Sequence, residues 1–231
     1  MRRKWIIVGV MLIFFVLAGF AVAWHFNILP EESYTAKDFG IVVLQSDVDY
    51  NQNGRDDYED ILMGAKLEAE NHPRYNGAYF QGGYPPSDIG VCSDVIWRAF
   101  RHAGYNIRDM VDADIQRRRE AYTEIVEPDS NIDFRRVRNL RIFFEEYAKK
   151  LTTDIEEIEE WQPGDIVIFG ENDHIGIVSD RRNKKGRPYI IHNAGQPNRD
   201  EDYIKWSWLE ITGHYRFDAS LIEDEVLVPW K

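Results

Sequence analysis

The stretch Gly90-Val-Cys-Ser-Asp-Val-Ile-Trp-Arg-Ala-Phe100 holds the single cysteine of the chain, Cys92. Apolar residues follow Cys92 at the spacing of one helix face and the pattern ends at Gly104, so a helix is predicted to begin beside the cysteine. A thiol at a helix N-terminus lies where the peptide dipoles favour negative charge, which lowers the pKa of the thiol. Cys92 is therefore a candidate nucleophile. The alternative is a small buried apolar residue, as most free cysteines are.

The chain changes from helical patterns to strand patterns downstream of Cys92. Apolar periodicity predicts helices over residues 58–69, 107–122 and 140–151. Short β-branched and aromatic runs bounded by turn residues predict strands over residues 41–44, 166–169, 174–178, 189–193, 206–209 and 214–217. Helices followed by a set of strands indicate an α+β fold, with N-terminal helices packed on an antiparallel β-sheet.

The first thirty residues form a separate segment. Basic residues at positions 2–4 precede Trp5–Trp24, a run without charge that is long enough for a bilayer core, which takes about 20 residues. The pattern predicts one N-terminal transmembrane helix, with the rest of the chain on the extracytoplasmic side of the cell membrane. Ala21-Val-Ala23 is an alternative signal-peptidase site, and cleavage there would make the protein secreted. The predicted domains are a signal anchor over residues 1–30, a linker over residues 31–65 and a catalytic domain over residues 66–231.

The exported part of the chain is strongly acidic. Without the basic residues at positions 2–4 it has 25 basic and 40 acidic side chains, a net charge of −15. Such a body repels nucleic acid and anionic lipid head groups, which excludes both as partners. A single cysteine also excludes a disulfide within the chain. The sequence leaves the oligomeric state open.

An acidic turn precedes the predicted helix 58–69. Oxygen-bearing side chains occupy positions 1, 3, 5, 9 and 12 of residues 49–60 and Gly54 occupies position 6, which is the layout of an EF-hand-type calcium loop. The predicted ligands are Asp49, Asn51, Asn53, Asp57 and Asp60, with Arg55 contributing its backbone carbonyl. Two of these ligands are uncharged amides, and an aspartate replaces the usual final glutamate. The alternative is a solvated polar turn. Structural Ca²⁺ is thus the one cofactor that the sequence suggests, and none is expected to be needed for catalysis.

A cysteine nucleophile needs a base that takes its proton and a third group that orients the base. His174 opens a predicted strand, and His192 lies near the end of the next one. Neighbouring antiparallel strands place such side chains side by side across the ladder, so the two imidazoles are predicted to meet. Histidines on strands are more often structural or exposed, and this is the interpretation for His214.

These residues belong to motifs that resemble a known superfamily, the NlpC/P60 papain-like cysteine peptidases. The resemblance rests on the order of Tyr79-x-x-Gly-Gly, Cys92-Ser at a helix start, Gly164-Asp-Ile-Val-Ile-Phe, His174-Ile-Gly-Ile-Val and Ile191-His192. Within that superfamily the chain is similar to the DUF1287 family, through Gly-Tyr-Pro-Pro at 83–86, the stretch around Cys92 and Gly-His-Tyr-Arg at 213–216. The resemblance extends from about residue 56 to residue 217.

The resemblance implies a papain-like NlpC/P60-type fold and a role for each matching residue. Cys92 matches the nucleophile, His174 the general base, and His192 the polar group that holds the imidazole of the base. Asn193, beside His192, is a weaker candidate for the third position. Tyr79 matches a tyrosine whose hydroxyl lies near the oxyanion, and the backbone N–H of Cys92 could complete that hole. A thiolate–imidazolium pair is expected in the resting enzyme.

The resemblance also implies an activity, hydrolysis of peptide or amide bonds in the cell envelope, with peptidoglycan peptides as the expected substrate. One position differs from the superfamily pattern, because Val91 replaces an aspartate that murein-cleaving members use near the amine of the peptide. The bond that is cleaved therefore stays open. Two other functions are compatible with the same residues. One is a catalytically silent, calcium-stabilised module that binds the envelope, and the other is a hydrolase or transferase of lipid acyl groups.

Overall fold

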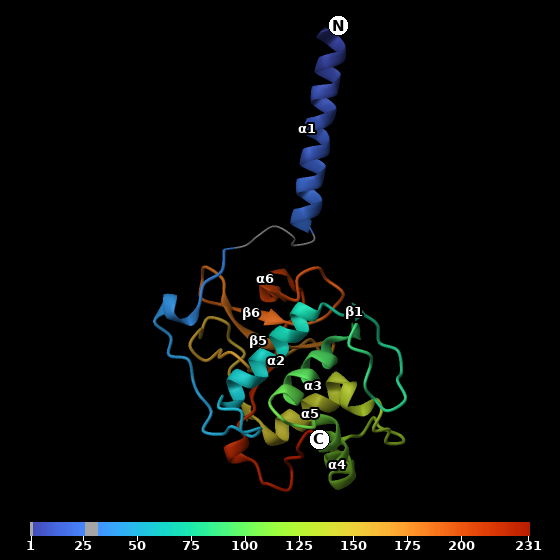
Figure 1. Cartoon of the computed structure of the whole chain (residues 1–231), viewed down its shortest axis with the longest axis vertical. Helices are drawn as coiled ribbons and strands as arrows, with labels where there is room; N and C mark the ends of the chain where they lie inside the picture. The colour runs from blue at the N-terminus through green and yellow to red at the C-terminus, as the bar shows by residue number, and fades with distance from the viewer. Residues whose placement is uncertain (1, 26–31) are drawn as a thin grey trace.

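The computed structural model describes residues 2–25 and 32–231 of the chain (Figure 1). Helix α1, Arg2–His25, stands apart from the rest of the chain. Among the described residues, no helix combines the length and the apolar character needed to cross a membrane. The predicted junction between anchor and linker, at residues 30 and 31, lies outside the described residues.

A six-stranded antiparallel sheet forms the centre of the body, and its strand order is β3-β8-β4-β5-β6-β7. These strands are β3 Lys149–Lys150, β4 Ile166–Phe169, β5 His174–Arg182, β6 Pro188–Ile191, β7 Asp200–Glu201 and β8 Ile211–Arg216. A separate two-stranded parallel sheet joins β1 Arg74–Tyr75 to β2 Ile89–Gly90. Helices combined with this antiparallel sheet confirm the predicted α+β class.

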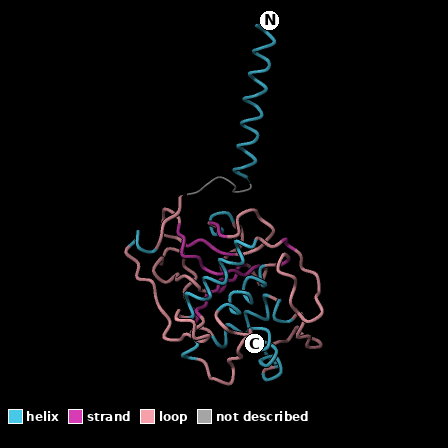
Figure 2. The backbone as a smooth tube through the Cα atoms, viewed as in Figure 1, coloured by secondary structure: helices cyan, strands magenta, loops and turns pink. Residues whose placement is uncertain are grey.

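Helices cover one face of the large sheet (Figures 1 and 2). Those that pack on the sheet are α2 Asp57–Asn71, α3 Cys92–His102 and α5 Val137–Tyr147, and α4 Ile107–Arg117 packs against α3 and α5. The described residues also form short 3₁₀ helices over Ala36–Phe39, Arg119–Ala121, Asp133–Arg135 and Ala219–Leu221. Helices α2 and α3 both pack on β5. They approach each other closely at Gly64, where a Cβ atom would lie 2.8 Å from Cα of Ala99. Only a glycine fits this crossing, which brings α3 and its N-terminal cysteine down onto the sheet.

Strand β4 shows why the sheet is buried on both faces. Ile166 and Ile168 pack into the main core beneath the helices, whereas Val167 and Phe169 pack into a second cluster with Trp161. Successive side chains of a strand point to opposite faces, so a continuous apolar run such as 166–169 needs a cover on each side. The second cover includes α6, Tyr203–Trp206.

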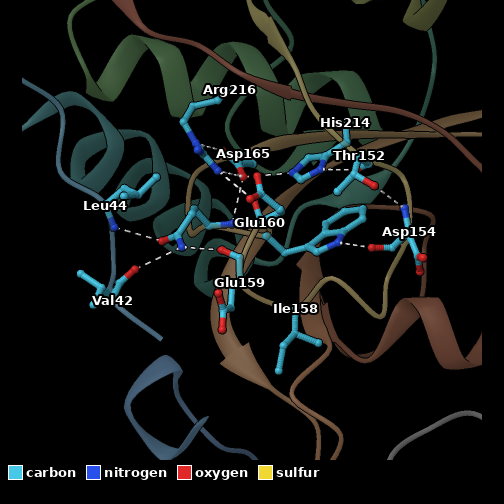
Figure 3. A network of polar contacts seen from close by, with 12 residues as sticks. Val42, Leu44, Thr152, Asp154, Ile158, Glu159, Glu160, Asp165, His214 and Arg216 are labelled. Atoms are coloured by element: carbon cyan, nitrogen blue, oxygen red, sulfur yellow. Dashed lines mark hydrogen bonds and ion pairs between the residues drawn. The ribbon is translucent and has the colours of Figure 1, made fainter. Parts of the chain in front are cut away.

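A buried polar network joins β4 and β8 on the second face (Figure 3). Asp165 accepts hydrogen bonds from Nη2 of Arg216 at 2.7 Å and from Nε2 of His214 at 3.0 Å. Nδ1 of His214 lies 2.7 Å from the carbonyl oxygen of Thr152, and the imidazole stacks on Trp161 at 3.9 Å between ring centroids. Both ring nitrogens therefore have partners, which supports the structural interpretation of His214.

Two predicted strands are wrong. Residues 206–209 include the end of α6 and a turn, because Tyr203 and Ile204 pack into the second cluster from a helix while Trp208 is 90% exposed. Residues 41–44 form no strand, and the side chain of Gln162 instead binds one backbone group each of Val42 and Leu44. Its Oε1 accepts from the N–H of Leu44 at 3.0 Å, and its Nε2 donates to the carbonyl of Val42 at 3.2 Å.

Residues 34–65 are part of the same body as the predicted catalytic domain. The predicted boundary after residue 65 falls inside α2, and Ile61 and Ala65 of that helix lie in the main core. At the start of the segment, Tyr34 exchanges backbone hydrogen bonds with Arg182 of β5 at 2.8 and 2.7 Å. These contacts make the predicted linker an integral part of the fold.

Candidate active site

Cys92 is the first residue of α3, and an ion pair fixes this end of the helix. The N–H of Val91 donates to Oδ2 of Asp94 at 2.7 Å. Asp94 also accepts from Nε and Nη2 of Arg135 at 2.8 and 2.9 Å, and both side chains are buried. Oγ of Ser93 donates to the backbone carbonyl of Arg135 at 2.8 Å. The sequence Cys-Ser-Asp therefore holds Cys92 against the 3₁₀ turn at residues 133–135.

A cleft of about 770 Å³ opens in front of Cys92. It is lined by Tyr75, Gly77, residues 91–93, Glu124, Ile132, residues 135–138 and residues 171–173. This volume lies within the range of small-ligand sites, about 300–1,000 Å³. Cys92 itself is 8% exposed, so the thiol lies at the bottom of the cleft instead of on the open surface.

The sulfur of Cys92 lies beside the start of β5. The backbone N–H of Ile175, the residue that follows His174, lies close enough to Cys92 to act against the rise of the pKa of its thiol. The start of α3 therefore meets the start of β5, where the predicted base is located. A sequence distance of more than eighty residues is closed because α3 packs along β5.

The two predicted histidines are in direct contact. Nε2 of His174 lies 2.8 Å from Nδ1 of His192, and both side chains are buried. Nε2 of His192 in turn lies 3.3 Å from Oε1 of Glu201, a buried residue of β7. A carboxylate only accepts, so Nε2 of His192 carries the proton and Nδ1 of His192 accepts from His174. Nε2 of His174 is then the donor, and the lone pair of this imidazole lies on its Nδ1.

Aromatic and amide side chains shield this histidine pair. The ring of Tyr203 lies 4.2 Å from the centre of His192 and 5.2 Å from the centre of His174. The side-chain amide of Gln196 donates to the backbone carbonyl of His192 at 3.1 Å. Water is thereby kept from the contact between the two imidazoles, which strengthens their hydrogen bond.

The charge state of the site differs from the expected thiolate–imidazolium pair. Burial raises the pKa of Cys92 to about 11, although N–H groups of Ile175 and of the helix start act in the opposite direction. Burial, together with His192, lowers the pKa of His174 to about 3. Burial also lowers the pKa of His192, against the opposing effect of Glu201. Burial therefore favours a neutral thiol and a neutral imidazole, because removal from water disfavours both charges.

The structure places Tyr79 away from the thiol. Its hydroxyl donates to Asp129 at 3.0 Å and accepts from the amide of Asn131 at 2.9 Å, and its side chain is exposed. Tyr75 lines the cleft instead, and its pKa is raised by burial and by the nearby Cys92. Tyr75 is therefore better placed than Tyr79 to contact an oxyanion at Cys92.

Asn193 supports the fold around the site. Its amide donates to the carbonyl oxygens of Gly90 at 3.0 Å and Pro73 at 3.3 Å, and the side chain is buried. These bonds hold the end of β6 to the two-stranded sheet that precedes Cys92. Asn193 has a positioning role in the structure and does not line the cleft of Cys92.

The predicted calcium loop has the expected backbone. Gly54 adopts φ +89°, and Asp49 accepts from the N–H groups of Asn53 and Gly54 at 3.0 and 2.8 Å. At the last position Asp60 accepts from the amides of Asn51 and Asn53 and from Nε of Arg55 at 2.8 Å. Asp57 accepts from the N–H of Tyr50 and the hydroxyl of Tyr105, and burial raises its pKa to about 6. Within residues 2–25 and 32–231, no three or more His, Cys, Asp or Glu side chains are grouped to hold a metal ion.

Comparison with known proteins identifies one family. The model of the domain of unknown function DUF1287 matches residues 62–217. The chain is also 36% identical over 167 residues to Uncharacterized protein YijF of Escherichia coli (strain K12), an alignment that covers 68% of this chain and 80% of that protein. No solved structure matches the chain. The matched segment contains all residues of the cleft and of the histidine pair.

Proposed function

The chain belongs to the DUF1287 family, and we propose that it is a thiol hydrolase that cleaves amide bonds of cell-envelope peptides, most directly those of peptidoglycan. The observation that carries the proposal is the position of Cys92 at the cleft and beside the start of β5, the strand that carries His174 and its contacts to His192 and Glu201. A nucleophile, a base and an orienting group are the three roles that acyl transfer requires. We assign the fold to the NlpC/P60 papain-like superfamily on the same grounds, together with the motif order of the sequence.

In the proposed reaction, Sγ of Cys92 attacks the carbonyl carbon while Nδ1 of His174 takes the thiol proton. His192 and Glu201 hold the imidazolium of His174 as it forms. The backbone N–H of Cys92 and the hydroxyl of Tyr75 are the donors for the oxyanion. His174 then gives the proton to the leaving amine as the C–N bond breaks, which leaves a thioester on Cys92. A water molecule, deprotonated by His174, hydrolyses the thioester and restores the thiol.

An arginine in the cleft favours a peptide with a free carboxylate as the substrate. Arg136 lines the cleft, is exposed, and forms no ion pair with any carboxylate of the described chain. The neighbouring Arg138 pairs with Glu124, and Arg135 pairs with Asp94. An unpaired guanidinium in a body of net negative charge favours an anionic ligand, because a planar fork of N–H donors matches a carboxylate.

The N-terminal segment is part of the proposal. We propose that the uncharged run Trp5–Trp24 directs export, so that the catalytic domain acts outside the cytoplasm. A retained segment would tether the protein to the cell membrane, and a cleaved one would release it. Fractionation of cells, with sequencing of the N-terminus of the exported protein, distinguishes the two outcomes.

A silent binding module on the same scaffold is the second candidate, and it is favoured by the raised pKa of Cys92 and by Val91 at the cleft. The deciding experiment is digestion of purified cell-wall sacculi by the parent protein and by Cys92→Ala, with mass analysis of the released peptides. The hydrolase releases new amino and carboxyl termini, and Cys92→Ala releases none. Equal release by both proteins, or release by neither, rules out the proposed enzyme.

A further inference from the structure

Three arginines of the described chain line the cleft of the proposed active site, and they differ in their partners. Arg135 pairs with the buried Asp94, and Arg138 pairs with Glu124. Arg136 is exposed, and its guanidinium forms no hydrogen bond or ion pair with any described residue. The charge of Arg136 is therefore free to act on a ligand in the cleft.

Acidic side chains around the cleft do not neutralise Arg136. Asp133 is buried and accepts from the N–H of Asp129 at 2.7 Å; burial raises its pKa, whereas Arg136 acts in the opposite direction. Glu171 and Asp173 line the cleft from the turn between β4 and β5, and they form no ion pair within the described chain. A ligand carboxylate is repelled by that turn and attracted by Arg136. The charges of the cleft thus direct an anionic group toward the start of α5.

The start of α5 is fixed and adds donors for an anion. The N–H of Arg136 donates to the carbonyl of Asp133 at 3.2 Å, and its carbonyl accepts from the N–H of Leu140 at 3.0 Å. Arg136 is the N-cap of α5, which has no capping side chain and no acidic residue in its first turn. Val137 and Arg138 of that turn line the cleft. The first N–H groups of a helix have no partner within it, and the helix dipole favours negative charge there.

We propose that Arg136 and the start of α5 form a carboxylate subsite, which binds a carboxylate of the peptide within about three residues of the bond that Cys92 attacks. The inference rests on the proposed hydrolase and narrows its substrate class. A cleft of about 770 Å³ is about 9 Å across when compact, and two or three extended residues at about 3.3–3.6 Å each span that distance. A planar guanidinium matches a carboxylate through two parallel hydrogen bonds.

Two parts of a peptide can supply this carboxylate. If the peptide C-terminus supplies it, the scissile bond lies near that end and the enzyme removes C-terminal residues. If an acidic side chain supplies it, the enzyme cleaves within the peptide. The two sources give different products, so mass analysis separates them.

Substitutions at Arg136 separate its charge from its shape. Arg136→Gln keeps N–H donors and removes the charge, whereas Arg136→Lys keeps the charge and removes the planar fork. Both should leave the melting temperature unchanged, because the guanidinium forms no hydrogen bond or ion pair with the described chain. Arg117→Gln is the matched control, since Arg117 is exposed, pairs with Glu225 and lines a different cavity.

The test measures binding by calorimetry to the full chain carrying Cys92→Ala. The probe is a synthetic peptide with the sequence of the main fragment that a muramidase releases from purified sacculi. It is used with all carboxylates free, with the C-terminus as an amide, and with the side-chain carboxylates as amides. We expect the free peptide to bind about tenfold more tightly than the amide that removes the bound carboxylate. Arg136→Gln should abolish that preference, Arg136→Lys should keep part of it, and Arg117→Gln should keep all of it.

The outcomes distinguish the inference from the hydrolase. Equal binding of the three forms, no binding of the free peptide, or a preference that survives Arg136→Gln overturns the carboxylate subsite. If the parent still digests sacculi, the hydrolase remains. An equal loss of preference in Arg117→Gln shows a general effect of charge and also overturns the subsite. A preference that depends on Arg136, without digestion of sacculi by the parent, removes the hydrolase and keeps the subsite as a binding site.

Discussion

Nε2 of His192 lies 3.3 Å from Oε1 of Glu201, and in the proposed reaction this contact determines which nitrogen of His174 takes the thiol proton. With the proton of His192 directed to Glu201, Nδ1 of His192 accepts from His174 at 2.8 Å, and the lone pair of His174 remains on its Nδ1. Glu201 therefore acts as a positioning residue at the end of the chain of contacts.

Substitution of Glu201 tests that role. Glu201→Gln keeps an oxygen acceptor but loses the charge that stabilises the proton on His192, so we expect kcat/KM on sacculi fragments to fall by about tenfold or more. The acid limb of the pH–rate profile should shift toward lower pH, because the charge of Glu201 raises the pKa of His192 and its loss makes the histidine pair harder to protonate. Asp200→Asn is the control, since Asp200 contacts Ser179 and Arg181 and no histidine. An unchanged rate for Glu201→Gln would show that the contact is structural.

The raised pKa of Cys92, about 11, predicts a slow thiol at neutral pH. Only the thiolate is alkylated, so the rate with iodoacetamide should rise with pH throughout pH 6–9 and show no plateau there. His174→Asn should leave this rate nearly unchanged, because a neutral imidazole supplies no charge to the thiolate. A plateau below pH 7 that disappears in His174→Asn would instead demonstrate a thiolate–imidazolium pair.

The pKa of His174, lowered to about 3, is expected to set the acid limit of the proposed hydrolysis. The neutral imidazole accepts the thiol proton, and it persists as pH falls until the lowered pKa is approached. Activity on sacculi fragments should therefore be retained well below pH 6.5, the ordinary value for histidine. A rate that halves near pH 6.5 in the folded protein would show that His174 is solvated when substrate binds.

Gly176 allows the histidines to meet. A Cβ atom at this position would lie 2.6 Å from Cγ2 of Ile190 and 2.9 Å from the carbonyl oxygen of Ile191 on the adjacent strand. We expect Gly176→Ala to separate β5 from β6, to lower the free energy of unfolding by about 1–3 kcal/mol, and to displace His192. Denaturant unfolding measures the first effect. Gly77→Ala is the control, because its Cβ would meet only Val91 at an ordinary 3.7 Å.

The sequence predicted the residues whose positions follow from local patterns. Cys92 starts a helix, His174 starts a strand and His192 follows the next strand, so the antiparallel pair brings the two histidines into contact and α3 packs on the strand that carries His174. The partners that complete the site depend on tertiary packing. Glu201 belongs to a strand of two residues, Tyr75 to an equally short parallel pair, and neither carries a periodic pattern that can be recognised.

The ionisation of the Cys92 thiol was harder to predict from the sequence than its position at a helix start. The start of α3 favours a thiolate through its dipole, and the sequence shows that dipole clearly. Burial of Cys92 opposes ionisation of the thiol. That burial depends on the close approach of α2 and α3 at Gly64 and on the packing of α3 against the sheet. The same packing leaves Tyr79 on the outside with Asp129 and brings Tyr75 to the cleft.

In the predicted calcium loop, Arg55 already pairs with a carboxylate that a cation would need as a ligand. Nε of Arg55 lies 2.8 Å from Oδ1 of Asp60, the final predicted ligand. We therefore expect Ca²⁺ to compete with this guanidinium and to bind the parent weakly, with Kd of about 10⁻³ M or above, and to bind Arg55→Ala more tightly by calorimetry. Arg55→Ala keeps the backbone carbonyl that position 7 supplies. Asp60→Asn should abolish binding in both backgrounds, since a neutral amide cannot replace the bidentate carboxylate. If Arg55→Ala takes up no calcium at about 10 mM, ten times that expected Kd, the loop is a polar turn closed by its own arginine.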